Sequence, residues 1–536
     1  MQAQPMKFLI AVMVVTLAQG GKILIKPFGQ CWGSHLLNLE FLAGFLVDKG
    51  HEVYFIAPSR YAGPYNPYAK NFKNKVHLIK YTTPEFEMEH SFQSCDTSDS
   101  IDNIRKESPT KQLHYRMSHE FSHCKALFMS TGSLKRIKNL KADLVITDSL
   151  AVCGSILATY LDIPYVTVDM VPGSHRSVWD LPHTPYLPGV DMPFSDQMTL
   201  MERVQNSVSQ YFLQPIQNYI FRGYFLNPFR ELLEYCNLTD VTLTDLVNHG
   251  AAYRIYNTDF SIEYPSPVLP NMAFIGGFFN TGSRPLEKEV TSFLQDVEEK
   301  EGLVIVSMGS RTRYDIQWGN LFAKALALLP CKVIWRHIPD TNDLDDFPSE
   351  HGKNTMIVKW LPQRELLSNP KTKLFVTHAG AGSMFEAVYH GVPVLTIPLI
   401  ADQPHQAKKL TDRLKMGTYL EVSTLTADSL HSELLTVLNN TVYAKNAKKA
   451  SKILRLSLEG HGQKILSVIN SAIAAKGAMH LQSKLNHMSW YQYYSVDVIL
   501  VVVICLMLLP MPLYICSRFF SNMTVRDKMK VASKND

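Results

Sequence analysis

The stretch THAGAGSMFEAVYHGVPVLTIPLIADQ, residues 377–403, decides the fold class of this 536-residue chain. Apolar runs on either side of a helical pattern predict two short buried strands joined by a helix. The turn into the helix uses only small residues, from Ala379 to Ser383. Such a turn lets the backbone approach a phosphate closely, where free N–H groups and the helix dipole hold it. An alternative stays open, because Ser383 as N-cap and Glu386 also fit a helix-capping box.

The same strand–helix–strand pattern recurs along the whole chain. Residues 23–57 contain one such unit, residues 141–169 contain a second, and the pattern restarts after a Pro- and Gly-rich segment near residue 280. We therefore predict two tandem Rossmann-like α/β domains, at residues 21–280 and 281–490. In such folds ligands bind at the carboxyl ends of the parallel strands, so the cleft between the domains is the expected active site.

Both ends of the chain carry targeting patterns. Residues 1–20 combine a basic flank, an apolar run and small residues before a cleavage position, which predicts a secretory signal peptide. Residues 497–517 are long and apolar enough to cross a bilayer, and residues 518–536 are rich in Lys and Arg. The positive-inside rule assigns this basic tail to the cytosol. We expect a single-pass type I protein of the endoplasmic reticulum membrane, with both domains in the lumen.

Composition bears on partners and modifications. The net charge is only +5 and no basic block occurs, so we expect no nucleic acid partner. No CxxC motif is present, and we expect neither a metal nor a cofactor. The lumen permits disulfides, but the spacing of the eight Cys predicts no framework. Sequons at Asn237 and Asn439 predict two glycans, whereas the sequon at Asn522 follows the predicted span and should stay bare.

His35 is the candidate general base. It opens the predicted helix that follows the first strand, at the end that faces the cleft. A hydroxyl group that attacks carbon must lose its proton, and His suits this task near neutral pH. Taken alone, such a His is more often a surface or capping residue. Asp148 favours the catalytic interpretation, because it ends a strand of the second unit and can orient the imidazole from the same edge.

Two further motifs flank the small-residue turn. Trp360-Leu361-Pro362-Gln363 precedes it, and Asp402-Gln403 closes the unit. Taken together, residues 360–403 resemble the nucleotide-sugar signature of the UDP-glycosyltransferases, the family that includes the UDP-glucuronosyltransferases. The resemblance covers almost the whole chain. It implies a GT-B fold, with the acceptor bound by the first domain and the UDP-sugar, a co-substrate rather than a cofactor, bound by the second.

The resemblance also implies the chemistry. His35 and Asp148 would form the general-base dyad of a direct displacement that inverts the anomeric carbon and needs no metal. The acceptor would be a small lipophilic compound with a hydroxyl group. Residues 184–206 resemble the acceptor-side segment of these enzymes, although their aromatic and Met residues suit plain core packing equally well. The chain could also form a homo-oligomer.

The same resemblance assigns donor contacts. Trp360 would stack on uracil, Gln363 would bond near it, and Glu386 would take the ribose hydroxyls. Asp402 and Gln403 would hold the hydroxyls of the sugar. The pyrophosphate would be held by two turns, which contribute Ser307, Gly309, Ser310, His378, Gly380 and Ser383.

Three positions bear on how the donor is bound. Many family members have Gly at position 379 and Asn at position 382, where this chain has Ala379 and Gly382, so backbone groups must replace an amide side chain. The resemblance implies an Arg in glucuronosyl members at the position that matches Asn257 of this chain. Asn257 cannot neutralise a carboxylate, and Arg254 would point to the opposite face of a strand. We therefore expect UDP-glucose or UDP-N-acetylglucosamine as donor, with two alternatives: a UDP-glucuronosyltransferase, or a catalytically silent membrane-tethered binding protein.

Overall fold

A computed structural model gives the architecture of the chain. It describes residues 20–28, 33–61, 63, 65, 69, 72–83, 109–174, 186–189, 192–213, 216, 227–242, 246, 250–281, 284–295, 302–310, 312–340, 348, 350–483, 488–493 and 495–532. The contacts divide the chain into two units, Met1–Leu481 and Gln482–Asp536, and each is described by itself. Residues 1–19 of the predicted signal peptide and part of the acceptor-side segment lie outside the described residues.

The first half of the large unit is built on a parallel sheet. Within the described residues its strand order is β3-β2-β1-β4-β5-β6-β7. These strands are β1 (Lys22–Lys26), β2 (Glu52–Pro58), β3 (His77–Tyr81), β4 (Leu144–Asp148), β5 (Tyr165–Asp169), β6 (Tyr253–Tyr256) and β7 (Met272–Phe274). The helices of this half are α2 (Gly33–Asp48), α3 (Phe72–Lys75), α6 (Pro109–Met129), α7 (Thr131–Leu140), α8 (Val152–Leu161), α9 (Leu200–Val208) and α11 (Pro228–Tyr235).

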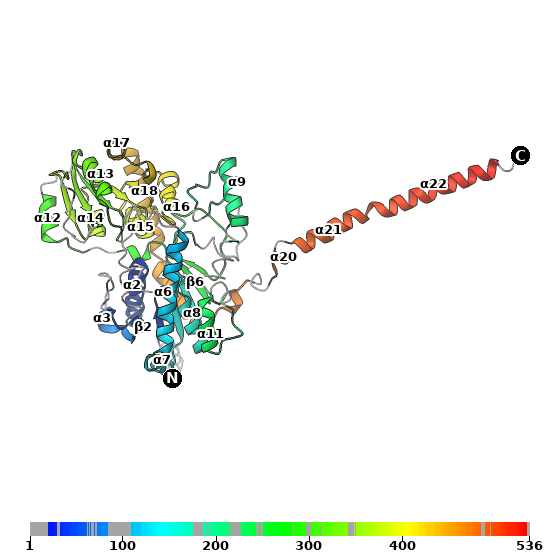
Figure 1. Cartoon of the computed structure of the whole chain (residues 1–536), viewed down its shortest axis with the longest axis horizontal. Coiled ribbons are helices and arrows are strands. Elements are labelled where there is room, and N and C mark those ends of the chain that lie inside the picture. The colour runs from blue at the N-terminus through cyan, green and yellow to red at the C-terminus, as the bar shows by residue number, and fades with distance from the viewer. Residues whose placement is uncertain are drawn as a thin grey trace, which may run out of the picture. The chain divides into compact units, whose positions relative to one another are not determined.

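The second half repeats the arrangement. Its described strands follow the order β10-β9-β8-β11-β12-β13. These are β8 (Leu303–Ser307), β9 (Lys332–Arg336), β10 (Thr355–Val358), β11 (Thr372–Thr377), β12 (Val394–Thr396) and β13 (Gly417–Tyr419). Its helices are α12 (Lys288–Gln295), α13 (Ile316–Ala327), α14 (Gln363–Ser368), α15 (Ala381–His390), α16 (Gln403–Lys408), α17 (Ala427–Asn439), α18 (Thr441–Leu458) and α19 (His461–Ala474), most of which are labelled in Figure 1. The prediction of a doubly wound α/β protein with two parallel sheets is confirmed.

Burial explains why these residues form strands and helices. The strands β1 and β8 have the runs KILIK and LVIVS, whose apolar side chains are buried on both faces of their sheets. A strand that is buried on both faces reads as a continuous apolar run, as expected for parallel sheets covered by helices. On one face of the first sheet the core includes Leu39 of α2, and on the other it includes Ile156 of α8.

Each sheet has a topological switch point. In the first sheet the order reverses between β1 and β4, and in the second between β8 and β11. Loops that leave neighbouring strands at such a point diverge to opposite faces and leave a crevice at the carboxyl ends. His35 and Asp148 lie at the first of these switch points, and the turns that begin at Ser307 and His378 lie at the second.

One helix links the two halves. In chain order α19 follows the second sheet, yet its residues Ile465, Val468, Ile469 and Ala472 belong to the core of the first sheet. A disulfide between Cys124 and Cys153 joins α6 to α8. Since the sequence predicted no disulfide framework, this bridge is a finding of the tertiary structure, which brings two helices of one face together.

The small C-terminal unit is helical. It contains α20 (Trp490–Tyr493), α21 (Val496–Leu508) and α22 (Pro510–Ala532). Residues Val496–Thr524 form a helix that is long and apolar enough to cross a membrane. The span was predicted at residues 497–517, and the described helix extends past this end into the predicted basic tail.

Candidate active site

His35 and Asp148 meet at the switch point of the first sheet. His35 lies in the first turn of α2, which follows β1, and Asp148 is the last residue of β4, which pairs with β1. His35 Nδ1 lies 2.6 Å from Asp148 Oδ2, and both side chains are buried. Asp148 Oδ1 accepts a hydrogen bond from the Leu150 N–H. The carboxylate is therefore fixed by the backbone and orients the imidazole, as the sequence predicted, while the catalytic role of the pair stays a prediction.

Acidic neighbours set the pKa of His35. Burial alone lowers this pKa, but the charge of Asp148 and its hydrogen bond raise it, and the charges of Asp169 and Asp402 add to the increase. The pKa of His35 therefore lies above its usual 6.5. Asp148 and Asp169 come from the first half and Asp402 from the second, so the carboxyl edges of both sheets face this imidazole.

Asp169 is a site residue that sequence reasoning missed. It ends β5, and its Oδ1 accepts a hydrogen bond from the Val171 N–H. Burial raises the pKa of this carboxyl, while a hydrogen bond from Ser174 opposes the increase. The sequence contains a signal that could have identified it, because Asp169 ends an apolar strand in the same way as Asp148.

In the second half, the turn after β8 is held by an arginine. Arg336, at the end of β9, donates hydrogen bonds from Nη1 to the Gly309 carbonyl and from Nη2 to the Ser310 carbonyl, both at 2.6 Å. Gly309 has a φ of 95°, a conformation that favours glycine. Because the carbonyls of this turn are occupied by Arg336, its geometry is set before any ligand binds. The sequence did not identify Arg336, since only the pairing of β9 with β8 brings it to the turn.

His378 packs between the two turns of the second half. A Cβ atom added to Gly309 would lie 2.7 Å from His378 Nε2, and one added to Gly380 would lie 2.5 Å from it. The imidazole thus needs glycine at both positions. Burial, together with the charge of Arg336, lowers the pKa of His378 to about 4. This side chain is neutral at physiological pH and can serve as a hydrogen-bonding group but not as a cation.

The small-residue turn opens α15 without a capping box. Gly380 is the N-cap of α15 and Ser383 lies within its first turn, where no side-chain cap hydrogen bond forms. The alternative reading of Ser383 and Glu386 as a capping pair is therefore wrong. Ala379 has a φ of 61°, a left-handed conformation that suits glycine better than alanine. A glycine at this position would adopt the same backbone without that strain.

Glu386 lies at the centre of a hydrogen-bond network. Gln363 Nε2 donates to Glu386 Oε2 at 2.6 Å and to Ser383 Oγ at 3.2 Å. Arg364 Nε donates to Glu386 Oε1 at 2.8 Å, and Asn280 Nδ2 donates to the same oxygen at 3.3 Å. The network brings three predicted donor residues together and orients them, while Arg364 and Asn280 are contributions that the sequence did not reveal.

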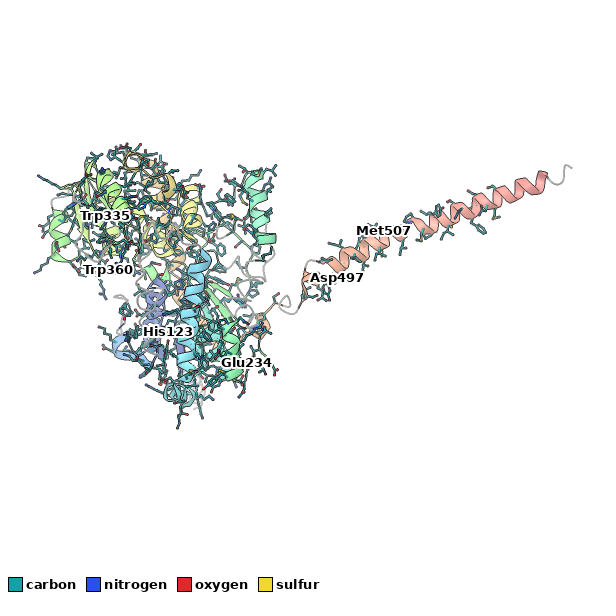
Figure 2. All side chains as sticks on the ribbon, in the orientation of Figure 1. His123, Glu234, Trp335, Trp360, Asp497 and Met507 are labelled. Carbon is teal, nitrogen blue, oxygen red and sulfur yellow. A yellow bond between two sulfur atoms is a disulfide. The ribbon has the colours of Figure 1, made fainter. Side chains whose placement is uncertain are left out.

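In the sequence, Trp360 precedes the residues of this network from the second half and Gln403 follows them. Trp360 follows β10 and is 64% exposed, so its ring face is open to a ligand. Figure 2 labels it together with Trp335, which is buried in the same half. Gln403 Oε1 accepts hydrogen bonds from the Leu399 and Ile400 N–H groups. These bonds fix the amide oxygen, so that the NH2 group of Gln403 is the part of the amide that can donate to a ligand.

The remaining predicted residues have different environments. Asn257 follows β6, is buried, and accepts a hydrogen bond from the Gly277 N–H at 3.2 Å. Arg254 lies within β6, in register with Thr167 of β5. The sequon residues Asn237 and Asn439 are both exposed.

A cavity lies at the carboxyl ends of the first strands, beside the helix of His35. Its lining includes Leu36, the neighbour of His35, and is otherwise mostly apolar or aromatic: Pro27, Phe28, Ile56, Ala57, Pro58, Tyr61 and Tyr81, with Lys26 and His123 as polar members. Its volume of about 10 Å³ has room for little more than one water molecule, so this cavity is part of the packed interior beside the imidazole and does not hold a substrate.

Sequence reasoning also overlooked a His-Glu-x-x-His sequence, formed by His119, Glu120 and His123 on α6. This spacing can bind zinc in other proteins. Here the buried Lys26 ammonium lies 3.9 Å from Glu120. Burial and the charge of Lys26 lower the pKa of His119 to about 4. A cation already occupies this environment, and the described residues contain no group of three or more His, Cys, Asp or Glu side chains arranged to hold a metal.

Comparisons with known proteins identify the class to which this fold and site belong. A glycotransferase of kitacinnamycin superposes with a TM-score of 0.55 at 16% identity, covering 85% of this chain and 99% of that one. A UDP-glucosyltransferase from Polygonum tinctorium superposes with a TM-score of 0.55 at 17% identity, covering 85% and 98%. The protein therefore has the GT-B fold of glycosyltransferases, as predicted.

Sequence comparison defines the family. The family described as UDP-glucoronosyl and UDP-glucosyl transferase matches residues 21–531. UDP-glucuronosyltransferase 1A9 of Mus musculus is 31% identical, covering 93% of this chain and 92% of its own length. UDP-glucuronosyltransferase 2B1 of Rattus norvegicus is 30% identical, covering 90% of each chain. This chain belongs to the UDP-glycosyltransferase family and is an enzyme of that class, which confirms the family resemblance seen in residues 360–403.

Proposed function

We propose that the protein transfers a sugar from a UDP-sugar to a hydroxyl group of a small lipophilic acceptor, with His35 as the general base. The observation that carries this proposal is the buried contact of 2.6 Å between His35 Nδ1 and Asp148 Oδ2. With Nδ1 bonded to the carboxylate, Nε2 is the nitrogen that takes a proton. The lipophilic character of the acceptor is proposed from the aromatic and Met residues of residues 184–206.

The proposed reaction is one direct displacement. The acceptor oxygen forms a bond to the anomeric carbon as its proton moves to His35 Nε2. The bond between that carbon and the UDP oxygen breaks, and its electron pair leaves with UDP. Attack from the face opposite to UDP inverts the anomeric configuration. Asp148 stabilises the imidazolium that forms, and the N-terminus of α15 stabilises the charge that develops on UDP. We propose that no metal or cofactor is needed, because these groups already supply a base and charge stabilisation.

For the donor, we propose that the second half binds the nucleotide in the manner predicted from the sequence. The exposed ring of Trp360 suits stacking on a base. The turns at Ser307–Ser310 and at His378–Ser383 lie at the switch point of the second sheet and would hold the pyrophosphate. Glu386, which Gln363 and Arg364 orient, would accept hydrogen bonds from the ribose. Asp402 would accept hydrogen bonds from the hydroxyls of the sugar, and Gln403 would donate to them from its NH2 group.

For the sugar itself, we propose a neutral hexose, UDP-glucose or UDP-N-acetylglucosamine. Asn257 carries no charge, so it cannot neutralise the carboxylate of a glucuronate. A desolvated carboxylate without a partner is costly to bind. UDP-glucuronate is the second candidate, because the curated relatives at about this level of identity are named glucuronosyltransferases.

A matrix of donors and acceptors tests the proposal. UDP release is measured with the full-length protein in microsomes, using UDP-glucose, UDP-N-acetylglucosamine and UDP-glucuronate against a panel of phenols and alcohols. We expect acceptor-dependent UDP release with a neutral donor, and we expect Asn257→Arg to raise the relative use of UDP-glucuronate. A clear wild-type preference for UDP-glucuronate contradicts the donor assignment. If the protein binds UDP but no pair of donor and acceptor gives UDP release, the catalytically silent binding protein is favoured.

We also propose the topology predicted from the sequence: a cleaved signal peptide, a single span, both halves in the lumen of the endoplasmic reticulum and a cytosolic tail. The apolar helix Val496–Thr524 supports the span, and the exposure of Asn237 and Asn439 suits glycosylation. Glycosidase treatment should shift the mobility of the wild-type protein. In Asn237→Gln and in Asn439→Gln, each of which loses one glycan, the shift should be smaller. A glycan at Asn522 contradicts the assigned orientation.

A further inference from the structure

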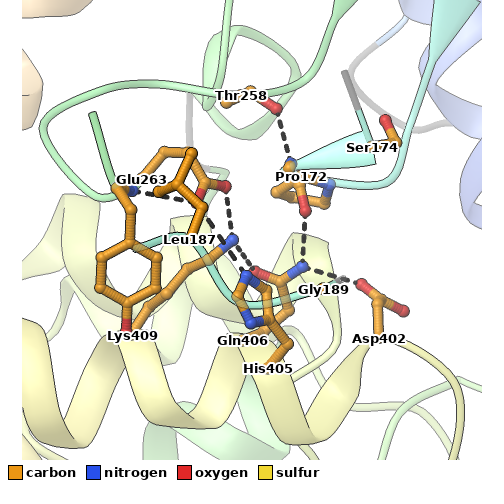
Figure 3. A network of polar contacts seen from close by, with 12 residues as sticks. Pro172, Ser174, Leu187, Gly189, Thr258, Glu263, Asp402, His405, Gln406 and Lys409 are labelled. Carbon is orange, nitrogen blue, oxygen red and sulfur yellow. Dashed lines mark hydrogen bonds and ion pairs between the residues drawn. The ribbon is translucent and has the colours of Figure 1, made fainter. Parts of the chain in front are cut away.

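A buried polar network connects the two halves of the large unit (Figure 3). Lys409, at the end of α16, donates from Nζ to Glu263 Oε2 at 2.5 Å and to Gln406 Oε1 at 2.9 Å. Glu263 belongs to the segment between β6 and β7 of the first sheet. All three side chains are at most 1% exposed. An ion pair and an amide, both removed from water, thus bridge the halves.

The ammonium of Lys409 determines which way the Gln406 amide points. Lys409 can only donate hydrogen bonds, so the atom facing it must be the amide oxygen. The NH2 group of Gln406 then faces the other way, where it donates to the Pro172 carbonyl at 2.9 Å and to Asp402 Oδ2 at 3.1 Å. Both of its hydrogens are used, and Figure 3 shows the three connections.

The partners of that NH2 group belong to the two facing edges of the active site. Pro172 lies in the loop after β5, the strand that ends in Asp169, and its neighbour Gly173 donates from N–H to Thr258 Oγ1 at 3.0 Å. This loop is therefore fixed on both sides. Asp402 belongs to the second half and lies close enough to His35 to influence its pKa. A single amide thus connects the acid of one half to the backbone of the other.

We propose that Gln406, oriented by the buried Lys409–Glu263 pair, is a positioning residue that holds Asp402 opposite His35 so that the carboxylate meets the sugar of the donor. We call Glu263, Lys409 and Gln406 the clasp. This inference rests on the proposed function, in which Asp402 holds sugar hydroxyls. The clasp acts on the sugar part of the donor, because its amide donates to Asp402, the residue assigned to the sugar.

A purely structural clasp would have a different signature. If the network only joins the halves, its loss weakens every ligand that the closed cleft binds and lowers the stability of the fold. If it positions Asp402, its loss weakens the binding of UDP-glucose but leaves the binding of UDP unchanged, because UDP has no hexose to place. The ratio of the two dissociation constants separates these cases and does not depend on turnover.

The variant Gln406→Glu tests the proposal with the smallest change of shape. The carboxylate retains an acceptor for Lys409 but replaces the NH2 group with an oxygen that faces two other acceptors. We expect UDP-glucose to bind about tenfold more weakly, as for a lost hydrogen bond to a charged group, with the Kd of UDP unchanged. Gln317→Glu, the same substitution at an exposed position of α13, is the matched control and should change neither constant.

The double variant Glu263→Met/Lys409→Met keeps the test decisive if Gln406→Glu does not fold. Replacing both members of a buried ion pair with apolar residues is often neutral for stability, whereas removing one member is costly. We expect this variant to fold and to show the same selective weakening of UDP-glucose, because the Gln406 amide is no longer oriented. Calorimetry with UDP and UDP-glucose on the full-length protein in detergent gives both constants.

Two results would overturn the clasp as a positioning device: an unchanged Kd for UDP-glucose, or an equal weakening of UDP and UDP-glucose. Failure of the proposed function has another signature, since it appears in the donor and acceptor matrix of the wild-type protein. If UDP-glucose binding depends on the clasp but no UDP is released from UDP-glucose, the positioning role of Gln406 stands and the proposed catalysis does not.

Discussion

Two histidines lie at the switch points of the two sheets and have opposite properties. His35 follows β1 and His378 follows β11, each at the switch point of its sheet. The pKa of His35 lies above its usual value, whereas that of His378 is lowered to about 4. Burial lowers the pKa in both cases, so the difference comes from the charged neighbours. Carboxylates surround His35, and the Arg336 guanidinium lies near His378.

The contrast shows how one fold, used twice, separates two tasks. The edge of the first sheet holds acids that favour a protonated imidazole, which is the environment of a group that accepts a proton. The edge of the second sheet combines small residues, backbone N–H groups and a neutral imidazole, which suits binding of an anion without proton transfer. We therefore expect substitutions at the first edge to change catalysis and those at the second to change donor binding.

The largest expected effect is that of His35→Ala. Loss of the base should lower kcat by about 10²–10⁴-fold, the usual contribution of general-base catalysis, while the Kd of UDP stays unchanged because the base acts on the acceptor. The measurement is UDP release at saturating donor, with UDP affinity by calorimetry. A wild-type rate in this variant refutes the assignment of His35 and revives the binding-protein alternative.

A smaller effect is expected for Asp148→Asn. In the wild type, activity should rise with pH through the pKa of His35, above 6.5, because only the neutral imidazole accepts a proton. Asp148→Asn removes the main influence that raises this pKa while burial still lowers it, so the acidic limb of the kcat/KM profile should move to lower pH. The plateau should also fall, by up to the loss expected for His35→Ala, because the imidazole loses the carboxylate that fixes its tautomer.

The control for this shift is a profile recorded with the same acceptor, so that ionisation of the substrate cancels. An acidic limb that stays at the same pH in Asp148→Asn means that another group controls the profile. A limb that moves upward contradicts the sign derived from the loss of the carboxylate.

The smallest effect is a predicted absence of pH dependence at the second edge. Since the pKa of His378 is about 4, this imidazole stays neutral from pH 5.5 to pH 8. In His35→Ala, which lacks the imidazole that titrates in this range, the Kd of UDP-glucose, whose diphosphate has no ionisation there, should then change little with pH. Titration calorimetry at several pH values measures it. Binding that strengthens as pH falls through 6 indicates a protonated His378 and removes the contrast with His35.

Much of the fold could be predicted from the sequence because its signals are local. The runs KILIK and LVIVS, which became β1 and β8, are apolar throughout, and covered parallel strands need this pattern. The family signature in residues 360–403 was likewise readable, since the residues that orient one another there, such as Gln363 and Glu386, lie within one short segment. The limits of the membrane helix were less clear, because hydropathy marks the apolar core of a helix and not its ends.

The sequence by itself determined the class of the fold, the family, the position of His35 at the start of a helix and that of Asp148 at the end of a strand. These depend on periodicity and on spacing along the chain. Only the tertiary structure decided which distant groups act on them. Arg336 reaches the Ser307–Ser310 turn because β9 pairs with β8, and Gln406 reaches Pro172 across 234 positions of sequence. The direction of each histidine's pKa shift belongs to the same class of property, since electrostatic interactions depend on distance in space and on burial, neither of which a linear sequence contains.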